Sequence, residues 1–184
     1  MENYSPAEHR FRFAAWAASR AASRGLSGFS TAIAQKALKA AKLCAICNGP
    51  SNLPENANDF DAAHRVWCKS VIEASGPNSV LSYGRAAKLV NVYLKVLFLS
   101  DFGLKSQAPT VDRARVDAIH PPIDRVLLTE LARQEPTHKD FWKAMRNKGW
   151  TNFDQDEYQD VIAKVREITN GQLWRIEAYW KGSQ

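Results

Sequence analysis

Hydrophobic residues recur every three or four positions along most of the chain, which is the spacing of helices that bury one face. The alternation of apolar and polar residues that is typical of strands does not recur in the same way. The pattern predicts helices over about 6–24, 30–48, 58–76, 84–100, 120–133, 136–149, 154–170 and 172–181. The sequence therefore predicts an all-α fold, in which residues 1–184 form a single compact domain of seven or eight helices.

Capping residues and prolines support these boundaries. Ser5-Pro6-Ala7-Glu8 has the form of a capping box with proline at the first helical position, and Asp154 and Glu157 have the spacing of a second box. The other expected helix starts are Ser30, Asn58 or Asp59, His120-Pro121-Pro122, and Pro136. Glycines are expected to end five helices, at Gly25, Gly49, Gly76, Gly149 and Gly171.

The segment 84–100 is apolar on most of its sides, which is typical of a helix at the centre of a domain. Two connections are polar. Residues 51–58 are expected to form a loop. Residues 101–116 form a long charged connection, and a connection of that length in a compact domain is often functional.

Composition excludes several classes of protein. Hydrophobic residues make up 45% of the chain and charged residues 24%, which is ordinary for a globular protein and unlike a disordered one. No apolar run is long enough to span a membrane, and the first residues lack the apolar stretch of a secretory signal. Three cysteines argue against a disulfide framework. We therefore expect a cytoplasmic protein that does not enter a membrane.

The charge is unevenly distributed. The net charge is +6, and residues 1–92 hold 11 basic and 6 acidic side chains, against 14 and 13 in residues 93–184. From His9 to Pro54 there are seven basic residues and no acidic one. A field of one sign favours a polyanionic partner such as nucleic acid, although a solvated basic face has the same composition.

Cys44 and Cys47, together with His64 and Cys68, have spacings that suit a tetrahedral zinc site. The alternative is that the cysteines are small core residues, since each lies in a predicted apolar helix. The second interpretation is favoured, and we expect neither a metal nor another cofactor.

Two segments carry a motif. SYGRAAKLVNVYLKV (82–96) places a tight glycine-containing turn before an apolar helix, and RVDAIHPPIDRVLLTEL (115–131) follows after the long connection. Together they resemble the helix-hairpin-helix DNA glycosylase superfamily, the group of endonuclease III and 8-oxoguanine glycosylase. In that group a hairpin of the form LPGVGRKTANVVL is followed by VDTHVxRVLxRL. The matching residues are Gly84, Arg85, Lys88, Asn91, Val92, Leu94, Val116, Asp117, Arg125, Val126 and Leu127.

The resemblance implies that a helix-hairpin-helix-like element over about 79–133 binds duplex DNA through a backbone phosphate. Exposed N–H groups of the turn and the dipole of the following helix would attract that phosphate. The expected DNA-binding residues are Ser82, Tyr83, Gly84, Arg85, Arg20 and Arg24.

The resemblance also implies that the protein is a hydrolase that flips a base out of the stack and cleaves its N-glycosidic bond. A carboxylate would stabilise the positive charge that develops on the sugar. In members that are also lyases, a lysine amine forms a Schiff base with the sugar. Lys88 is the candidate amine, and Asp117 or Asp124 is the candidate carboxylate. If Lys88 is not the nucleophile, the carboxylate and water give a monofunctional glycosylase.

Aromatic residues are candidates for the base pocket. Trp16 lies near basic residues on the first predicted helix, and Trp67 and His120 are further candidates, although a core role suits large aromatic rings as well. The function expected from the sequence is base excision by a monomer on double-stranded DNA, either in repair of oxidised bases or in antiviral defence against hypermodified cytosine. The alternative is a non-catalytic helical module that binds nucleic acid or a protein.

Overall fold

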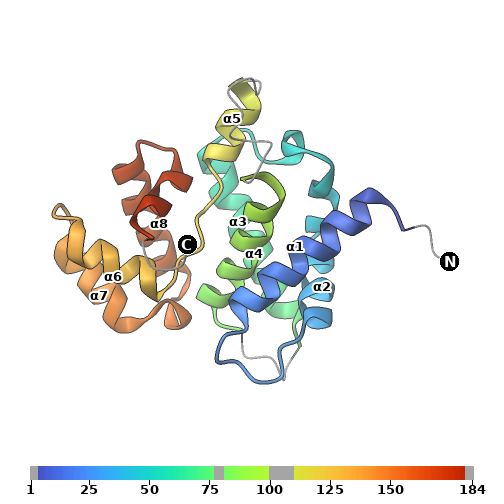
Figure 1. Cartoon of the computed structure of the whole chain (residues 1–184), viewed down its shortest axis with the longest axis horizontal. Coiled ribbons are helices and arrows are strands. Elements are labelled where there is room, and N and C mark those ends of the chain that lie inside the picture. The colour runs from blue at the N-terminus through green and yellow to red at the C-terminus, as the bar shows by residue number, and fades with distance from the viewer. Residues whose placement is uncertain (1–3, 77–80, 100–109, 181–184) are drawn as a thin grey trace.

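The computed structural model describes residues 4–76, 81–99 and 110–180 of the chain. Over these residues the fold is all-α, as the sequence predicts, and forms one compact domain (Figure 1). The α-helices are α1 (Pro6–Ala22), α2 (Thr31–Ala40), α3 (Ala57–Ala74), α4 (Tyr83–Phe98), α5 (Thr110–Asp117), α6 (Arg125–Gln134), α7 (Lys139–Lys148) and α8 (Gln155–Thr169). The 3₁₀ helices are η1 (Leu43–Asn48), η2 (Pro50–Asn52), η3 (Trp150–Asn152) and η4 (Leu173–Tyr179).

The helices form two groups, with α1 to α4 on one side and α6 to α8 on the other (Figure 1). Helix α4 is the central element, because it packs against α1 and α3 in the first group and against α8 and η3 in the second. Most of its side chains are buried, which confirms the prediction from its apolar sequence. Helices α6 and α7 pack against each other and stand beside this core.

Three predicted N-caps are confirmed. The Ser5 and Ser30 hydroxyls accept hydrogen bonds from the backbone N–H groups of Glu8 and Ile33. Asp154 and Glu157 form both bonds of a capping box at the start of α8. These side chains satisfy N–H groups that have no partner within the helix.

Two helix boundaries in the first group differ from the prediction. The expected helix over 30–48 ends at Ala40, because Lys42 takes a left-handed conformation with φ of 59° and the chain continues as η1. Helix α3 is capped by Asn56 instead of Asn58 or Asp59. The expected loop over 51–58 therefore holds part of η2 and the first two residues of α3.

The region before α6 also differs. The expected connection over 101–116 contains all but the last residue of α5, while its residues 101–109 lie outside the described part of the chain. Helix α6 begins at Arg125, with Asp124 as its N-cap, and not at His120. The physical reason is that each of two successive prolines, Pro121 and Pro122, disfavours the helical conformation in the residue before it. Helix α7 similarly begins at Lys139, after Pro136.

A search of the described residues for a bilayer-spanning helix, judged by length and apolar character, found none.

Candidate functional site

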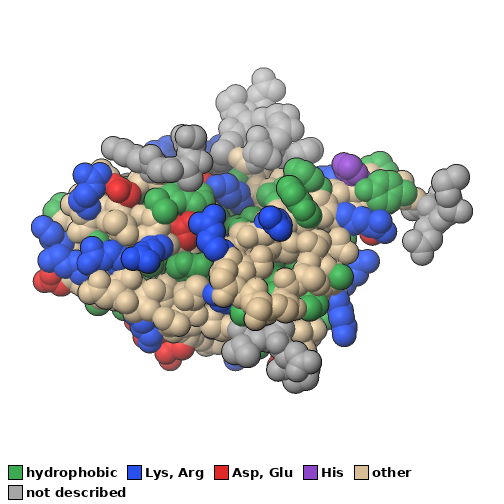
Figure 2. Space-filling view, turned by 60° about the horizontal axis from the view of Figure 1, so that its bottom comes forward, with side chains coloured by type: hydrophobic (Ala, Val, Ile, Leu, Met, Phe, Trp, Pro, Cys, Tyr) green, Lys and Arg blue, Asp and Glu red, His purple; other side chains and the backbone are tan. Residues whose placement is uncertain are grey.

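A pocket of about 480 Å³ opens between the two groups of helices. Its walls come from the end of α1, one face of α4, the segment before α6, the start of α6, η3 and the residue after η4. The lining residues are Ala21, Arg24, Lys88, Val92, Lys95, Val96, Pro122, Asp124, Arg125, Val126, Trp150, Thr151 and Trp180. We call this the Lys88 pocket. Figure 2 shows Lys and Arg side chains on both sides of the hollow between the two halves of the molecule.

Lys88 and Asp124 form the ion pair of this pocket. The Nζ atom of Lys88 lies 3.2 Å from Oδ2 of Asp124, and both side chains are largely buried. The same Nζ lies 4.6 Å from the centre of the Trp150 ring. Burial lowers the pKa of Lys88 below its ordinary value, although the Asp124 carboxylate acts in the opposite direction. A lysine in this setting is closer to being a neutral, nucleophilic amine than a lysine in water is.

Asp124 is held from two directions. Its Oδ1 atom accepts a hydrogen bond of 3.0 Å from the backbone N–H of Leu127, which makes it the N-cap of α6. Its Oδ2 atom faces Lys88. The carboxylate therefore has a fixed orientation at the pocket wall.

A chain of buried hydrogen bonds holds the segment that carries Asp124. The side-chain amide of Asn91, on α4, donates to the carbonyl of Pro121 and to the hydroxyl of Tyr158, both at 2.8 Å. His120 bonds Tyr158 through Nδ1 at 3.1 Å and Asp61 through Nε2 at 2.8 Å. Helices α3, α4 and α8 thus fix residues 120 and 121, and this places Asp124 opposite Lys88.

His64 extends the same network. Its Nε2 atom lies 2.8 Å from Oδ1 of Asn91, and its Nδ1 atom lies 3.6 Å from Sγ of Cys68. Burial lowers the pKa of His64 well below its ordinary value, and it lowers that of His120 as well. With both rings neutral, each imidazole donates one hydrogen bond and accepts another, so the network is satisfied.

Gly84 allows Trp150, an aromatic residue of the pocket wall, to lie close to α4. Its N–H donates to the carbonyl of Phe153 at 3.2 Å. A Cβ atom at this position would lie 1.9 Å from the carbonyl oxygen of Trp150, so only glycine allows α4 and η3 to come this close. The Gly84 N–H, which was expected to bind a phosphate, therefore forms a hydrogen bond within the protein.

The other residues of the expected hairpin also make internal contacts. Ser82 is the N-cap of α4, and Tyr83 is buried beside Tyr158. Arg85 donates to the carbonyls of Ala22 and Arg24 at 2.8 and 3.0 Å, which ties the end of α1 to α4. Residues 79, 80 and 100–109 of the expected element lie outside the described part of the chain.

The candidates on α1 lie on its surface. Arg24 is exposed and lines the Lys88 pocket. Arg20 is also exposed, but it is not one of the residues that line this pocket. Trp16 is 51% exposed and stacks on Phe13, with ring centroids 6.0 Å apart. It does not line the pocket.

Asp117 lies away from Lys88 and binds other residues. Its carboxylate accepts hydrogen bonds from Trp174 Nε1 at 2.7 Å, Arg113 Nε at 3.2 Å and Gln172 Nε2 at 3.3 Å. It therefore joins α5 to the region of η4. Of the two candidate carboxylates, the structure brings Asp124 to the lysine.

Two predicted pocket residues lie elsewhere. His120 is fully buried in the polar network, and Trp67 packs edge-on against Phe60 at 5.7 Å. The aromatic walls of the pocket are instead Trp150 and Trp180. Nothing in the sequence distinguished these two tryptophans from its other large aromatic residues, because both belong to segments far from the motif and reach Lys88 only through the fold.

The cysteines and His64 do not converge. Cys47, which is hydrogen-bonded to the Tyr93 hydroxyl at 2.9 Å, and Cys68, beside His64, are buried, which confirms the predicted core role. Cys44 is exposed, so the prediction is wrong for this cysteine. Among the described residues, no group of three or more His, Cys, Asp or Glu side chains is placed to hold a metal ion.

No described acidic residue neutralises the two arginines at the pocket mouth. Within the described residues, the Arg24 and Arg125 side chains have no carboxylate within ion-pair distance. Lys95 differs, because it pairs with Glu177 and lies over the Trp180 ring. The buried ion pair is therefore surrounded by cations that are free to attract an anion.

Searches against protein-family models, curated proteins and solved structures found no match to this chain.

Proposed function

We propose that this protein is a DNA glycosylase that draws one nucleotide into the Lys88 pocket and cleaves its N-glycosidic bond. The observation that carries the proposal is the buried Lys88–Asp124 pair, which opens into a pocket with tryptophan walls and an electropositive rim. A pocket of about 480 Å³ is of the size that holds a small ligand or a nucleotide base. The motif resemblance and the all-α fold agree with this function.

The surroundings suit an extruded base. Base flipping needs a pocket in which flat side chains receive the base and positive charge holds its phosphates. Trp150 and Trp180 supply flat apolar surface, and Arg24 and Arg125 supply charge at the rim. The apolar side chains Val92 and Val96 line the same face of α4.

Lys88 and Asp124 have complementary roles in the proposed reaction. The Lys88 ammonium passes a proton to Asp124, and the free amine attacks C1′ of the sugar. The bond between C1′ and the base breaks, and the base leaves with the electron pair and takes the proton from Asp124. The sugar ring then opens, with O4′ receiving a proton from Nζ, and a protonated Schiff base remains between Nζ and C1′. Once Asp124 has given this proton to the base, its negative charge stabilises the positive charge of the Schiff base.

Trapping with borohydride tests the nucleophile. We expect a short duplex with one abasic site, treated with borohydride, to become covalently attached to the protein, since hydride reduces the Schiff base. This substrate carries no base, so the result does not depend on which base is excised. Lys88→Gln should lower the yield by ~100-fold, because it removes the amine. Lys69→Gln removes an exposed lysine of α3 and should leave the yield unchanged.

The two carboxylates are compared in the same assay. Asparagine caps helices as well as aspartate does, so Asp124→Asn keeps the start of α6 while it removes the charge. We expect it to reduce the rate by ~100-fold or more. Asp117→Asn should lower thermal stability and keep most of the activity.

Base release is measured on duplexes that carry oxidised purines, alkylated purines, uracil or glucosylated hydroxymethylcytosine. Release from one of them, with loss of release in Asp124→Asn, supports the proposal. If the wild-type protein releases the base without forming an adduct, and Lys88→Gln still releases it, the enzyme is monofunctional. Salt-sensitive duplex binding without adduct or base release would show a non-catalytic binder and refute the proposal.

A further inference from the structure

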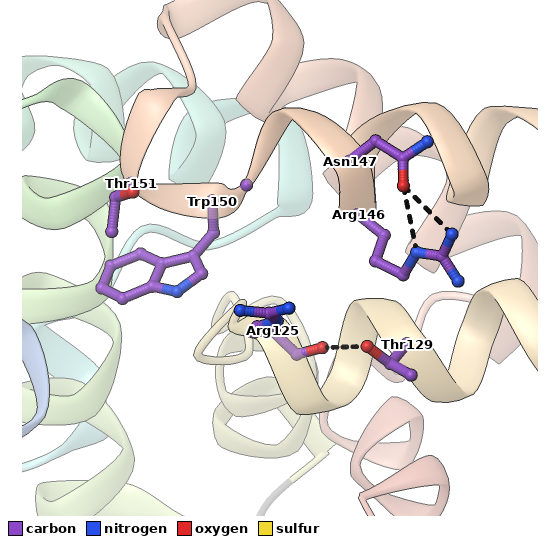
Figure 3. A pocket seen from close by; sticks show the side chains of 7 residues that line it. Arg125, Thr129, Arg146, Asn147, Trp150 and Thr151 are labelled. Carbon is purple, nitrogen blue, oxygen red and sulfur yellow. Dashed lines mark hydrogen bonds between the residues drawn. The ribbon is translucent and has the colours of Figure 1, made fainter.

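A second pocket adjoins the Lys88 pocket. It has a volume of about 800 Å³ and lies where α6 faces the end of α7 and η3 (Figure 3). Its lining residues are Arg125, Thr129, Arg146, Asn147, Gly149, Trp150 and Thr151. We call it the Arg146 pocket. Arg125, Trp150 and Thr151 line both pockets, so a ligand that fills one can continue into the other.

Two guanidinium groups, those of Arg125 and Arg146, face this pocket. None of the described residues that line it is acidic. Among the described residues, the Arg125 side chain makes no ion pair, and the single hydrogen-bond partner of the Arg146 side chain is the side-chain oxygen of its neighbour Asn147, at 3.0 and 3.3 Å. Arg133, farther along α6, differs because it pairs with Glu130 at 2.6 Å. The positive charges that face the pocket are therefore available to a ligand.

The hydrogen-bonding groups of the pocket define the chemistry of that ligand. The Thr129 hydroxyl already donates to the Arg125 carbonyl at 2.7 Å, and the Asn147 oxygen already accepts from Arg146 (Figure 3). The groups that remain are mainly guanidinium N–H donors. Guanidinium N–H donors with two positive charges suit a negative ligand that accepts hydrogen bonds and does not donate them. Phosphate is such a ligand, and arginine recognises its oxygens through N–H groups and charge.

We propose that the Arg146 pocket is a subsite for a backbone phosphate of the DNA strand whose nucleotide occupies the Lys88 pocket. This inference rests on the proposed function. The shared wall explains the arrangement, because Trp150 separates the extruded base from the adjoining phosphate while Arg125 reaches both. Arg146 then contacts the strand without touching the reacting sugar, since it lines only the second pocket.

The test uses the full chain and a duplex that contains a reduced abasic analogue, to which the protein binds without reaction. Arg146→Gln should weaken binding by ~10-fold and lower the slope of log K against log salt by about 1. The matched control is Arg133→Gln, which also removes one positive charge from this half of the molecule, and it should change binding by less than ~2-fold. In the trapping assay, Arg146→Gln should raise KM and leave the rate at saturating DNA unchanged.

A free nucleotide offers the same phosphate chemistry and is tested with ADP and with inorganic phosphate by calorimetry. If ADP binds and Arg146→Gln abolishes its binding while duplex binding is unchanged, the pocket takes a nucleotide and the proposal is wrong. It is also wrong if Arg146→Gln and Arg133→Gln bind the duplex equally well. The binding assay needs no chemistry, so a failure of the glycosylase proposal would appear separately, as the absence of both a trapped adduct and base release in the wild-type protein.

Discussion

Gly84 shows how the absence of a side chain positions a functional residue. Trp150 lies over Lys88 because its backbone approaches α4 at the one residue of the first turn that has no Cβ atom. The Gly84 N–H also donates to Phe153, so the contact is both close and directional. In the motif, this glycine is expected to approach a phosphate. In the structure, it admits the backbone of the protein itself.

Gly84→Ala should therefore destabilise the fold and disturb the site together. The new methyl group overlaps the Trp150 carbonyl, and backbone must move to accommodate it, at a cost of about 1–3 kcal/mol in the free energy of unfolding. Urea denaturation measures this cost. Gly49→Ala is the control, because a Cβ atom there meets only the Ser51 hydroxyl at 3.8 Å. Equal stability of the two variants would show that the contact between α4 and η3 is not tight.

The choice between two aspartates shows what the sequence could predict at single positions. Lys88 and both carboxylates were found from a local pattern. Two of the partners of Asp117, Trp174 and Gln172, lie more than fifty positions away in the chain and could not be foreseen. The position of Asp124 depends equally on Asn91 and Pro121, which meet only in the folded state.

At the scale of elements, capping residues and hydrophobic spacing predicted where the helices lie. They failed at boundaries that are set by a distant contact or by an unusual backbone angle. Asp154 and Glu157 cap α8 within four residues, and the prediction was right there. The left-handed conformation of Lys42, which ends α2 early, has no such local signal, because lysine does not favour it. The start of α6 was predicted too early, although Pro121 and Pro122 themselves argue against helix at His120.

The hydrogen bond from Asn91 on α4 to Pro121 predicts that Asn91 helps to position Asp124. Asn91→Ala removes the donors to Pro121 and Tyr158, and leaves buried polar groups without partners. The free energy of unfolding should fall by ~2–3 kcal/mol. In the trapping assay, the rate at saturating DNA should fall at least ~10-fold with little change in KM, because Asp124 loses its fixed place but the rim cations remain.

Asn52→Ala serves as the control for this variant, because Asn52 is exposed on η2. A merely structural role for Asn91 predicts a different result. The folded fraction of the variant would then react at the wild-type rate once its lower stability is taken into account.

At the scale of the whole molecule, the buried polar network joins the two groups of helices and depends on neutral histidines. His64 and His120 are fully buried, with ring centroids 4.4 Å apart, and connect α3 to α4, to α8 and to the segment before α6. A proton on His120 would place an N–H donor against the Tyr158 hydroxyl, which already accepts from Asn91. The fold therefore disfavours the charged form of both rings.

This dependence predicts that mild acid destabilises the protein. The pKa of both histidines is lowered in the folded state, whereas the unfolded chain takes up protons near the ordinary value of 6.5. Below that value the unfolded state binds more protons, so stability is full above pH 6.5 and falls as the pH decreases, by up to ~1.4 kcal/mol per pH unit for each histidine. Urea denaturation at about pH 7.5 and pH 5.5 measures the loss. The pKa of Asp61 is also lowered below its ordinary value of 3.8, so Asp61 takes up a proton only in stronger acid than the histidines do.

Two variants test whether the histidines cause this loss of stability. His64→Gln should reduce the dependence of stability on pH by about half, whatever its effect on stability at neutral pH. His9→Gln, at an exposed position, should leave this dependence unchanged. A stability that stays constant across this range in the wild-type protein would show that the two rings are protonated as easily in the fold as in water.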